Sequence, residues 1–241
     1  MEATYTTRIT VLEQIGYREW TESLGFDREW TIQESQARLY EELQSVSAKA
    51  GGFALPLRYD YMILLTSNIA PEVHAELLEV ARKHSRISVR LASSCGVSPL
   101  EAEVRALKLL SSTEPGGFTY ESCRGVEIVV MAHLDVNNIT GMTREVGVIR
   151  TYHSTINMVS RLSTVIEKSG GIIQYLGGDN MLVVLPTVNY VPLLESLVNK
   201  ENLKAGVGAA KSAREALKLA ARALHDIRSN RDTRVVFYID V

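Results

Sequence analysis

The segment YLGGDNMLVVLP comprises residues Tyr175–Pro186 and contains a short turn motif between two apolar runs. Two apolar runs flank Gly177, Gly178, Asp179 and Asn180. Glycine, aspartate and asparagine tolerate the positive φ of tight turns, so the segment predicts a β-hairpin. A structural turn alone would explain these residues. A functional role for the Asp179 carboxylate requires a second polar group beside it.

The segment VEIVVMAHLDVNNITG, residues 126–141, contains a candidate for that second group. It is nearly continuously apolar from Val126 to Leu134, which predicts a central, buried strand. Asp135 ends this strand, either as a cap of the following turn or as a carboxylate that the strand holds rigidly for a site. His133 shares a strand face with Asp135 and either supports the site or fills the core.

The order of predicted elements explains how the two acids would meet. In a β-α-β-β unit the first strand commonly lies beside the hairpin, so we expect Asp135 and Asp179 at the same end of the sheet. Two adjacent carboxylates repel each other unless a cation lies between them. Oxygen ligands without histidine or cysteine nearby suit Mg²⁺, and the backbone N–H groups of residues 136–141 could cradle a phosphate.

The predicted order β-α-β-β-α-β-α occurs twice, which indicates a tandem duplication of a ferredoxin-like or palm-type βαββαβ unit of the α+β class. The segment SPLEAEVRAL from Ser98 resembles SAREALKLAA from Ser212, and YDYMILL resembles GDNMLVVL, which sets Asp60 opposite Asp179. We expect an N-terminal domain at 1–113 and a C-terminal domain at 124–241. The polar segment between them is the predicted linker.

The composition limits the class of protein. The chain has 241 residues, 46% of them hydrophobic, and a net charge of −2. No basic stripe favours long nucleic acid. The two cysteines, Cys95 and Cys123, form no zinc motif, and we expect them to be reduced thiols. Without an apparent signal peptide or membrane span, the sequence predicts a cytoplasmic protein.

The motifs AHLDVNNITG and YLGGDNM, followed by LKAGVGAAKSAREALKLA, resemble the archaeal GTP cyclohydrolase III family. The resemblance extends from about Ile9 to Arg228. It implies a duplicated palm fold, distantly related to GGDEF-type nucleotidyl cyclases. It also implies an enzyme that opens the imidazole ring of GTP to give a formylamino-pyrimidine nucleotide monophosphate and inorganic phosphate. Mg²⁺, with two ions expected, a monovalent cation such as K⁺ and a homo-oligomer belong to the same expectation.

The resemblance also implies roles for individual residues. Asp135 and Asp179 match the metal-binding, catalytic acids of the family. The motif positions around nucleotide and metal correspond to Asn137, Asn138, Gly177, Gly178 and Asn180. Gly141 is a candidate for substrate binding because it ends the segment whose backbone N–H groups could cradle a phosphate. Two basic residues, Lys211 near the start of a helix and Arg228 where related cyclases keep a phosphate ligand, either bind substrate phosphates or are solvated charges.

The first half departs from the family pattern. The family has an aspartate in an IDNYG-like motif, and the sequence LEQIGYREW places Ile15 at that position. Tyr59-Asp60-Tyr61 replaces the FDN motif of the family. This alignment predicts a degenerate acid pair and no metal site in the first half.

Two alternatives use the same acids. One is a nucleotidyl cyclase or transferase of the palm superfamily, and the other is a non-catalytic nucleotide-binding relative, which the position of Ile15 favours. The segment AGVGAAKS, residues 205–212, is not a P-loop, because Ala210 occupies the position of the glycine before lysine.

Overall fold

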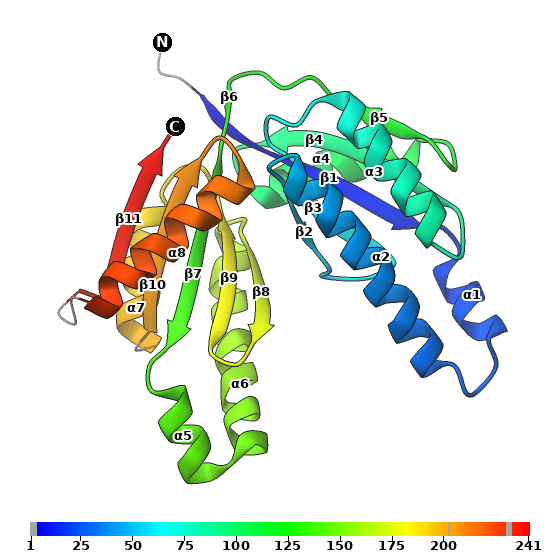
Figure 1. Ribbon diagram of the computed structural model, residues 1–241. Coiled ribbons are helices and arrows are strands. Elements are labelled where there is room, and N and C mark those ends of the chain that lie inside the picture. The colour runs from blue at the N-terminus through cyan, green and yellow to red at the C-terminus, as the bar shows by residue number, and fades with distance from the viewer. Residues whose placement is uncertain (1–3, 202, 230–232) are drawn as a thin grey trace.

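The computed structural model describes residues 4–201, 203–229 and 233–241, which form two mixed sheets (Figure 1). The first half contains β1 (Tyr5–Gln14), α1 (Tyr17–Ser23), α2 (Glu29–Lys49), β2 (Phe53–Leu55), β3 (Tyr61–Leu65), α3 (Pro71–His84), β4 (Val89–Gly96), α4 (Pro99–Ser111) and β5 (Phe118–Tyr120). After β6 (Val126–Glu127), the second half contains β7 (Val129–Val136), α5 (Ile139–Val146), α6 (Val148–Lys168), β8 (Ile172–Gly177), β9 (Asn180–Leu185), α7 (Tyr190–Glu201), β10 (Leu203–Ala210), α8 (Ala213–Ser229) and β11 (Val235–Asp240).

The two sheets have the same topology. The first has the order β2-β3-β1-β4-β5 and the second the order β8-β9-β7-β10-β11. In each sheet the central strand is antiparallel to both neighbours, and the last strand is parallel to the one beside it. The predicted tandem duplication of a palm-type α+β unit is therefore confirmed.

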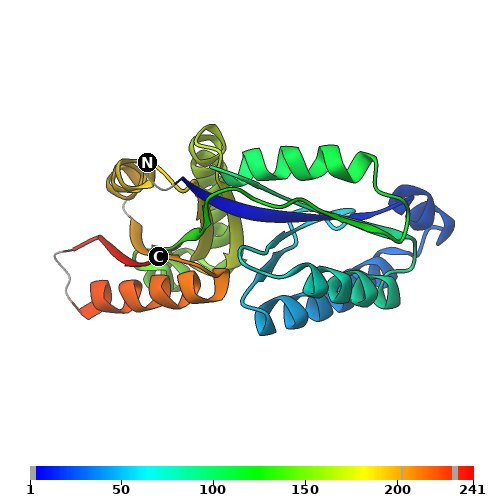
Figure 2. The same cartoon turned by 90° about the horizontal axis from the view of Figure 1, so that it is seen from above.

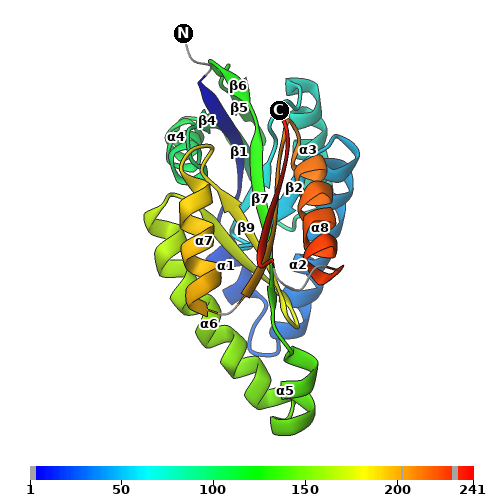
Figure 3. The ribbon, with the colours of Figure 1, turned by 90° about the vertical axis from the view of Figure 1, so that its left-hand side faces the viewer.

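The helices cover the sheets in the same way in both halves. Alternate residues of each strand face opposite layers, which produces separate cores on the two faces. On one face of the first sheet α2 and α3 bury Leu12, Met62 and Leu64, and α4 lies on the other face. In the second half α6 and α7 cover one face and α8 the other (Figure 3).

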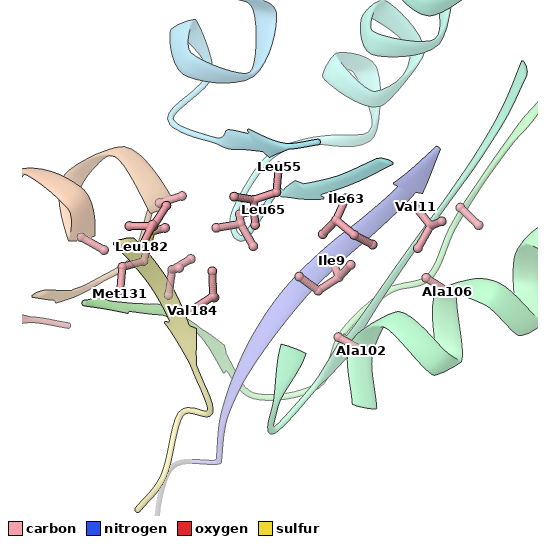
Figure 4. Close-up of a cluster of buried hydrophobic side chains, with 14 of the residues drawn as sticks. Ile9, Val11, Leu55, Ile63, Leu65, Ala102, Ala106, Met131, Leu182 and Val184 are labelled. Carbon is pink, nitrogen blue, oxygen red and sulfur yellow. The ribbon is translucent and has the colours of Figure 1, made fainter. Parts of the chain in front are cut away.

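One hydrophobic core joins the two halves. It contains Ile9 and Ile63 from the first sheet and Met131, Leu182 and Val184 from the second (Figure 4). Small residues of α4 and α8 complete it, namely Ala102, Ala106, Ala213 and Ala216. Because these side chains are almost completely buried, the contact between the halves excludes water as the interior of a domain does.

Two equivalent hydrogen bonds connect the halves. The amide of Leu100, at the start of α4, donates to the carbonyl of Gly170 after α6, at 3.0 Å. The amide of Arg214, at the start of α8, donates to the carbonyl of Gly51 after α2, also at 3.0 Å. Each glycine has positive φ, and a Cβ at Gly170 would lie 2.7 Å from Ser98 Oγ. Figure 2 shows α4 and α8 on opposite sides of the molecule, which indicates an internal pseudo-two-fold relation.

The segment predicted as a linker contributes to the first sheet. Residues 118–120 form β5, which pairs with β4, and β6 pairs with the start of β1. The first sheet thus includes residues beyond 113, the expected end of the N-terminal domain. A disulfide joins Cys95 on β4 to Cys123. The expectation of two reduced thiols was wrong, because the fold brings together two cysteines that are 28 residues apart.

The strand register corrects the alignment of the first half. Leu12 pairs with Met62 and Leu91, as Leu134 pairs with Met181 and Ala205. The next residue after each leucine is an acid, so Glu13 is the counterpart of Asp135. The counterpart of Ile15 is Asn137, and the prediction that Ile15 replaces the acid was wrong.

Among the described residues, no helix combines the length and the apolar character that a bilayer crossing requires.

Candidate active site

Asp135 lies at the end of β7, where neighbouring strands bring polar residues beside it. In the sheet register it faces Asn180 on β9 and Lys204 on β10. The amide of Val136 donates a hydrogen bond of 3.3 Å to the carbonyl of Asp179. Asp135, on β7, and Asp179, in the turn that precedes the adjacent strand β9, therefore lie at the same end of the second sheet.

The Asp135 carboxylate is buried, with 6% of the residue exposed. Burial raises the pKa of Asp135 above its ordinary value, because the charged form loses hydration. The negative charge of Asp179 raises this pKa further, and Arg228 and Lys204 oppose both effects. Ionised Asp135 thus depends on nearby positive charge.

One carboxylate oxygen of Asp135 has an ion-pair partner but no hydrogen bond among the described residues. Arg228 Nη2 approaches Asp135 Oδ1 to 3.3 Å, which is an ion-pair distance. Among the described residues, however, Oδ1 receives no hydrogen bond of acceptable geometry, although it is fully buried. A buried carboxylate oxygen without a hydrogen bond is destabilising. It suits a hard divalent cation such as Mg²⁺, which takes one or two carboxylates from the protein.

The turn that carries Asp179 is partly exposed and is held by specific hydrogen bonds. Gly177 and Gly178 have φ of 105° and 62°, and a Cβ at either position would meet no atom within 4 Å. Glycine is therefore favoured at both positions because of the positive φ, and not because a side chain would collide with a neighbour. Tyr175 Oη donates to the Gly178 carbonyl at 3.2 Å, and Asn180 Nδ2 donates to Asp179 Oδ1 at 2.8 Å.

Two cavities lie near the acids, one lined by Asp179 and the other by Arg228, the ion-pair partner of Asp135. One has a volume of about 700 Å³ and is lined by Asn137, Asn138, Lys204, Arg228, Thr233 and Arg234. The other, of about 620 Å³, lies between α5, α6 and the hairpin and is lined by Ile139, Thr140, Thr143, Arg144, Val148, Thr151, Tyr152, Thr155, Tyr175, Gly178 and Asp179. The first cavity has three basic residues, and the second combines aliphatic, aromatic and hydroxyl groups. Together they suit a ligand with an anionic part and a flat, partly apolar part.

Five of the ten site residues predicted from the sequence line these cavities. Asn137 and Asn138 line the basic cavity together with Arg228, and Gly178 and Asp179 line the other. Gly141 has a different role. It lies in α5, and a Cβ there would be 2.4 Å from Asn138 Oδ1. Gly141 therefore makes room for the Asn138 side chain instead of lining a cavity.

The structure places Lys211 away from the site. It follows the end of β10 that pairs with Val129, whereas Asp135 pairs with Lys204 at the other end of the same strand. The carbonyl of Lys211 accepts a hydrogen bond of 2.7 Å from Asn68 in the first half. The expectation that Lys211 binds substrate phosphates at this site was wrong.

Several residues that line the cavities were not predicted from the sequence. Lys204 and Arg234 lie at the starts of β10 and β11, and Tyr152 lies on α6. Lys204 could have been found from the alternation of a charged residue with buried ones in LKAGVGAA, once β10 was paired with β7. Nothing in the sequence around Tyr152 distinguishes it from other surface residues of an amphipathic helix.

The counterpart in the first half has an acid pair that is neutralised internally. Glu13 Oε2 accepts from Arg90 Nε at 2.6 Å, and Glu13 Oε1 accepts from Tyr61 Oη at 2.6 Å. Asp60 accepts from Arg58 Nε at 3.0 Å and from Arg58 Nη2 at 2.5 Å. Two guanidinium groups therefore compensate the two acids. The second half, with an unsatisfied buried oxygen, is the better candidate for a cation site.

A comparison with protein families matches residues 9–240 to the GTP cyclohydrolase III family. A GTP cyclohydrolase III of Aeropyrum pernix is 47% identical over 230 residues, which are 95% of each chain. One from Saccharolobus solfataricus is 30% identical over 225 residues, 93% of this chain and 96% of the relative. A GGEEF domain of a Vibrio cholerae diguanylate cyclase is 15% identical, with a TM-score of 0.42 over 59% of this chain and 93% of that one.

The fold and the site define a class of protein, namely a duplicated palm-type domain pair with two carboxylates at the end of the central strands of its second half. Within this class the chain belongs to the GTP cyclohydrolase III family and is an enzyme of that type.

Proposed function

We propose that this protein is a Mg²⁺-dependent GTP cyclohydrolase that opens the imidazole ring of GTP. The products would be the formylamino-pyrimidine nucleotide monophosphate and orthophosphate. Membership of the family supports the substrate. The observation that carries the metal dependence is the buried Oδ1 atom of Asp135, which has no hydrogen bond within the described residues and lies on the strand next to Asp179.

The two cavities suggest how GTP would bind. Lys204, Arg228 and Arg234 line the first cavity, and their positive charges suit a triphosphate. Tyr152 and Tyr175, whose ring centroids are 6.4 Å apart, contribute aromatic surface to the second cavity, which suits a purine. Because Asp179 lines the second cavity and the ion-pair partner of Asp135 lines the first, the acids would lie between the phosphates and the base.

Asp135 and Asp179 would hold the metal, for which two ions are expected. Bound Mg²⁺ supplies polarisation of the phosphate oxygens and activation of water. The protein itself contributes charge and position. Arg228 offsets the charge of Asp135 before a cation binds, and Tyr175 fixes the turn that carries Asp179.

The need for a monovalent cation such as K⁺ and the homo-oligomeric state remain part of this proposal. Exposed apolar side chains suitable for contact with a second copy are Phe26 and Trp30 near the start of α2 and Val148 and Ile149 at the start of α6. Light scattering on the purified protein would measure the oligomeric state.

The non-catalytic alternative loses its main support. It rested on the absence of an acid at Ile15, and the register shows that Glu13 occupies the equivalent position. The second half also keeps a buried carboxylate oxygen that has no hydrogen bond among the described residues.

The test is identification of the products formed from GTP and Mg²⁺. We expect orthophosphate, loss of the guanine ultraviolet spectrum and no free formate. Pyrophosphate beside an intact guanine spectrum would identify a nucleotidyl cyclase or transferase instead. Unchanged GTP with retained binding would identify a non-catalytic protein.

A further inference from the structure

His133 and Asn180 form a hydrogen-bonded chain that ends on the Asp179 carboxylate. His133 Nε2 lies 2.9 Å from Asn180 Oδ1, and Asn180 Nδ2 lies 2.8 Å from Asp179 Oδ1. His133 is on β7 and Asn180 is the first residue of β9, so two different strands contribute to the chain. His133 lines neither of the two cavities.

The chemistry of the three groups determines the direction of each hydrogen bond. An ionised carboxylate only accepts, so the Asn180 side chain must turn its NH₂ group toward Asp179. Its carbonyl oxygen then faces His133 and requires a donor. The imidazole can supply that donor only if Nε2 carries a hydrogen, so the geometry selects the Nε2–H tautomer of His133.

The turn itself explains why such support is needed. Gly177 and Gly178 have open space where a Cβ would lie, so hydrogen bonds, rather than side chains at these two positions, hold the turn and its carboxylate. If Asn180 rotated by 180° about its last side-chain bond, its oxygen would face the Asp179 carboxylate and repel it. A hydrogen bond from His133 excludes that rotamer.

We propose that His133 is a positioning residue, which orients Asn180 so that its amide group holds Asp179 ready for a divalent cation. The inference rests on the proposed function, since it assumes that Asp179 binds metal. Ligating carboxylates commonly have such hydrogen-bonded partners, and removal of a partner weakens metal binding. The first half lacks this chain, because strand register places Val11 at the position of His133 and Tyr61 at that of Asn180.

The experiment measures Mn²⁺ binding without nucleotide, by electron paramagnetic resonance, in the full chain. His133→Val introduces the residue found at the equivalent position of the first half and should raise the dissociation constant about tenfold or more. His133→Gln keeps an N–H donor and should restore binding to within about threefold of the wild type. His84→Val is the control, because it removes another half-buried histidine in the first half and should not change Mn²⁺ binding.

A double-variant comparison tests whether His133 acts through Asn180. If it does, Asn180→Ala should weaken Mn²⁺ binding, and adding His133→Val should cause little further loss. Two-bond ¹H–¹⁵N correlation spectra of the imidazole give a readout that needs no metal, and they should show the Nε2–H tautomer in the wild type.

Three results would overturn the inference while leaving the proposed function intact. They are wild-type Mn²⁺ affinity in the folded His133→Val variant, additive losses in the double variant, and an Nδ1–H tautomer. Failure of the wild-type protein to bind Mn²⁺ would instead refute the proposed function, and the positioning role would fall with it even if the tautomer were as expected.

Discussion

Glu13 and Asp135 occupy the same position in the two copies of the repeated unit, yet their surroundings differ. Glu13 accepts hydrogen bonds from Arg90 and Tyr61. Asp135 has Arg228 at 3.3 Å without a hydrogen bond to its buried oxygen. The duplication therefore produced one acid pair that is neutralised by two guanidinium groups and one in which a buried carboxylate oxygen has no hydrogen bond among the described residues.

We expect Asp135→Asn and Asp179→Asn each to reduce GTP turnover by at least about a hundredfold, because each removes a charged metal ligand with little change of shape. Orthophosphate release under saturating Mg²⁺ measures the effect. Circular dichroism should show an unchanged fold, and near-normal turnover by either variant would contradict the proposed site.

Asp135→Asn should also make the metal-free protein more stable near pH 7, by about 1 kcal/mol, because it removes a buried charge with an unsatisfied oxygen. The pKa of Asp135 is raised in the folded state by burial. The folded state thus binds the proton more tightly, and the wild type loses stability as pH rises from the ordinary pKa through the raised one.

The stability gain of the Asp135→Asn variant over the wild type should therefore shrink as pH falls through the raised pKa of folded Asp135. It should disappear below the ordinary pKa of an aspartate. Thermal unfolding of both proteins at several pH values, in the presence of a chelator, measures this dependence. A variant that is less stable than the wild type at pH 7 would show that Arg228 fully compensates Asp135.

Glu13→Gln and Asp60→Asn should cost much less turnover than Asp179→Asn. Arg90 and Arg58 already neutralise these acids, so a divalent cation has little to gain there. Steady-state kinetics of the purified variants is the measurement. A loss equal to that of Asp179→Asn would show that the first half takes part in catalysis.

Activity should require Mg²⁺ or Mn²⁺, and the active protein should contain no stoichiometric zinc. Among the described residues, Cys95, Cys123 and Glu127 form one group of zinc-type ligands. The cysteines are joined by a disulfide, and Glu127 is paired with Arg8 at 2.9 Å. Elemental analysis together with chelation and metal readdition tests this prediction, and an equivalent of zinc in fully active enzyme would refute it.

Reduction of the Cys95–Cys123 disulfide should lower the free energy of unfolding. The bond closes a segment of 28 residues, and a loop of that length corresponds to roughly 3.5 kcal/mol in the chain-entropy model. Denaturant unfolding with and without reductant measures the difference, and a Cys95→Ser/Cys123→Ser protein should be insensitive to reductant. Equal stability in both conditions would contradict the structural role of the bond.

The sequence was sufficient for the features that depend on strong local patterns. The apolar run before Asp135 and the glycines before Asp179 predicted the central strand and the hairpin, and the repeated order of elements predicted the duplication. The short helix α5 was missed. It begins after Asn138 in the left-handed region, with φ of 56°, a residue that by itself is typical of a turn.

The remaining errors concern residues whose roles depend on strand register or on distant parts of the chain. Glu13 is recognised as the equivalent of Asp135 only from its pairing with Tyr61 and Arg90. Comparison of motifs alone placed the equivalent position two residues later, at Ile15. Lys211 follows a glycine-rich strand and resembled a phosphate ligand, but it lies at the wrong end of that strand. The disulfide joins cysteines without a spacing motif.

The core shared by the two copies has a consequence for how the protein unfolds and how it could evolve. Met131 and Leu182 of the second sheet are buried in the same cluster as Ile9 and Ile63 of the first. Either copy expressed alone would present this surface to water and tend to aggregate. The chain should therefore melt in a single calorimetric transition. Gene fission into two separate polypeptides would survive only if the fragments assembled as they were synthesised.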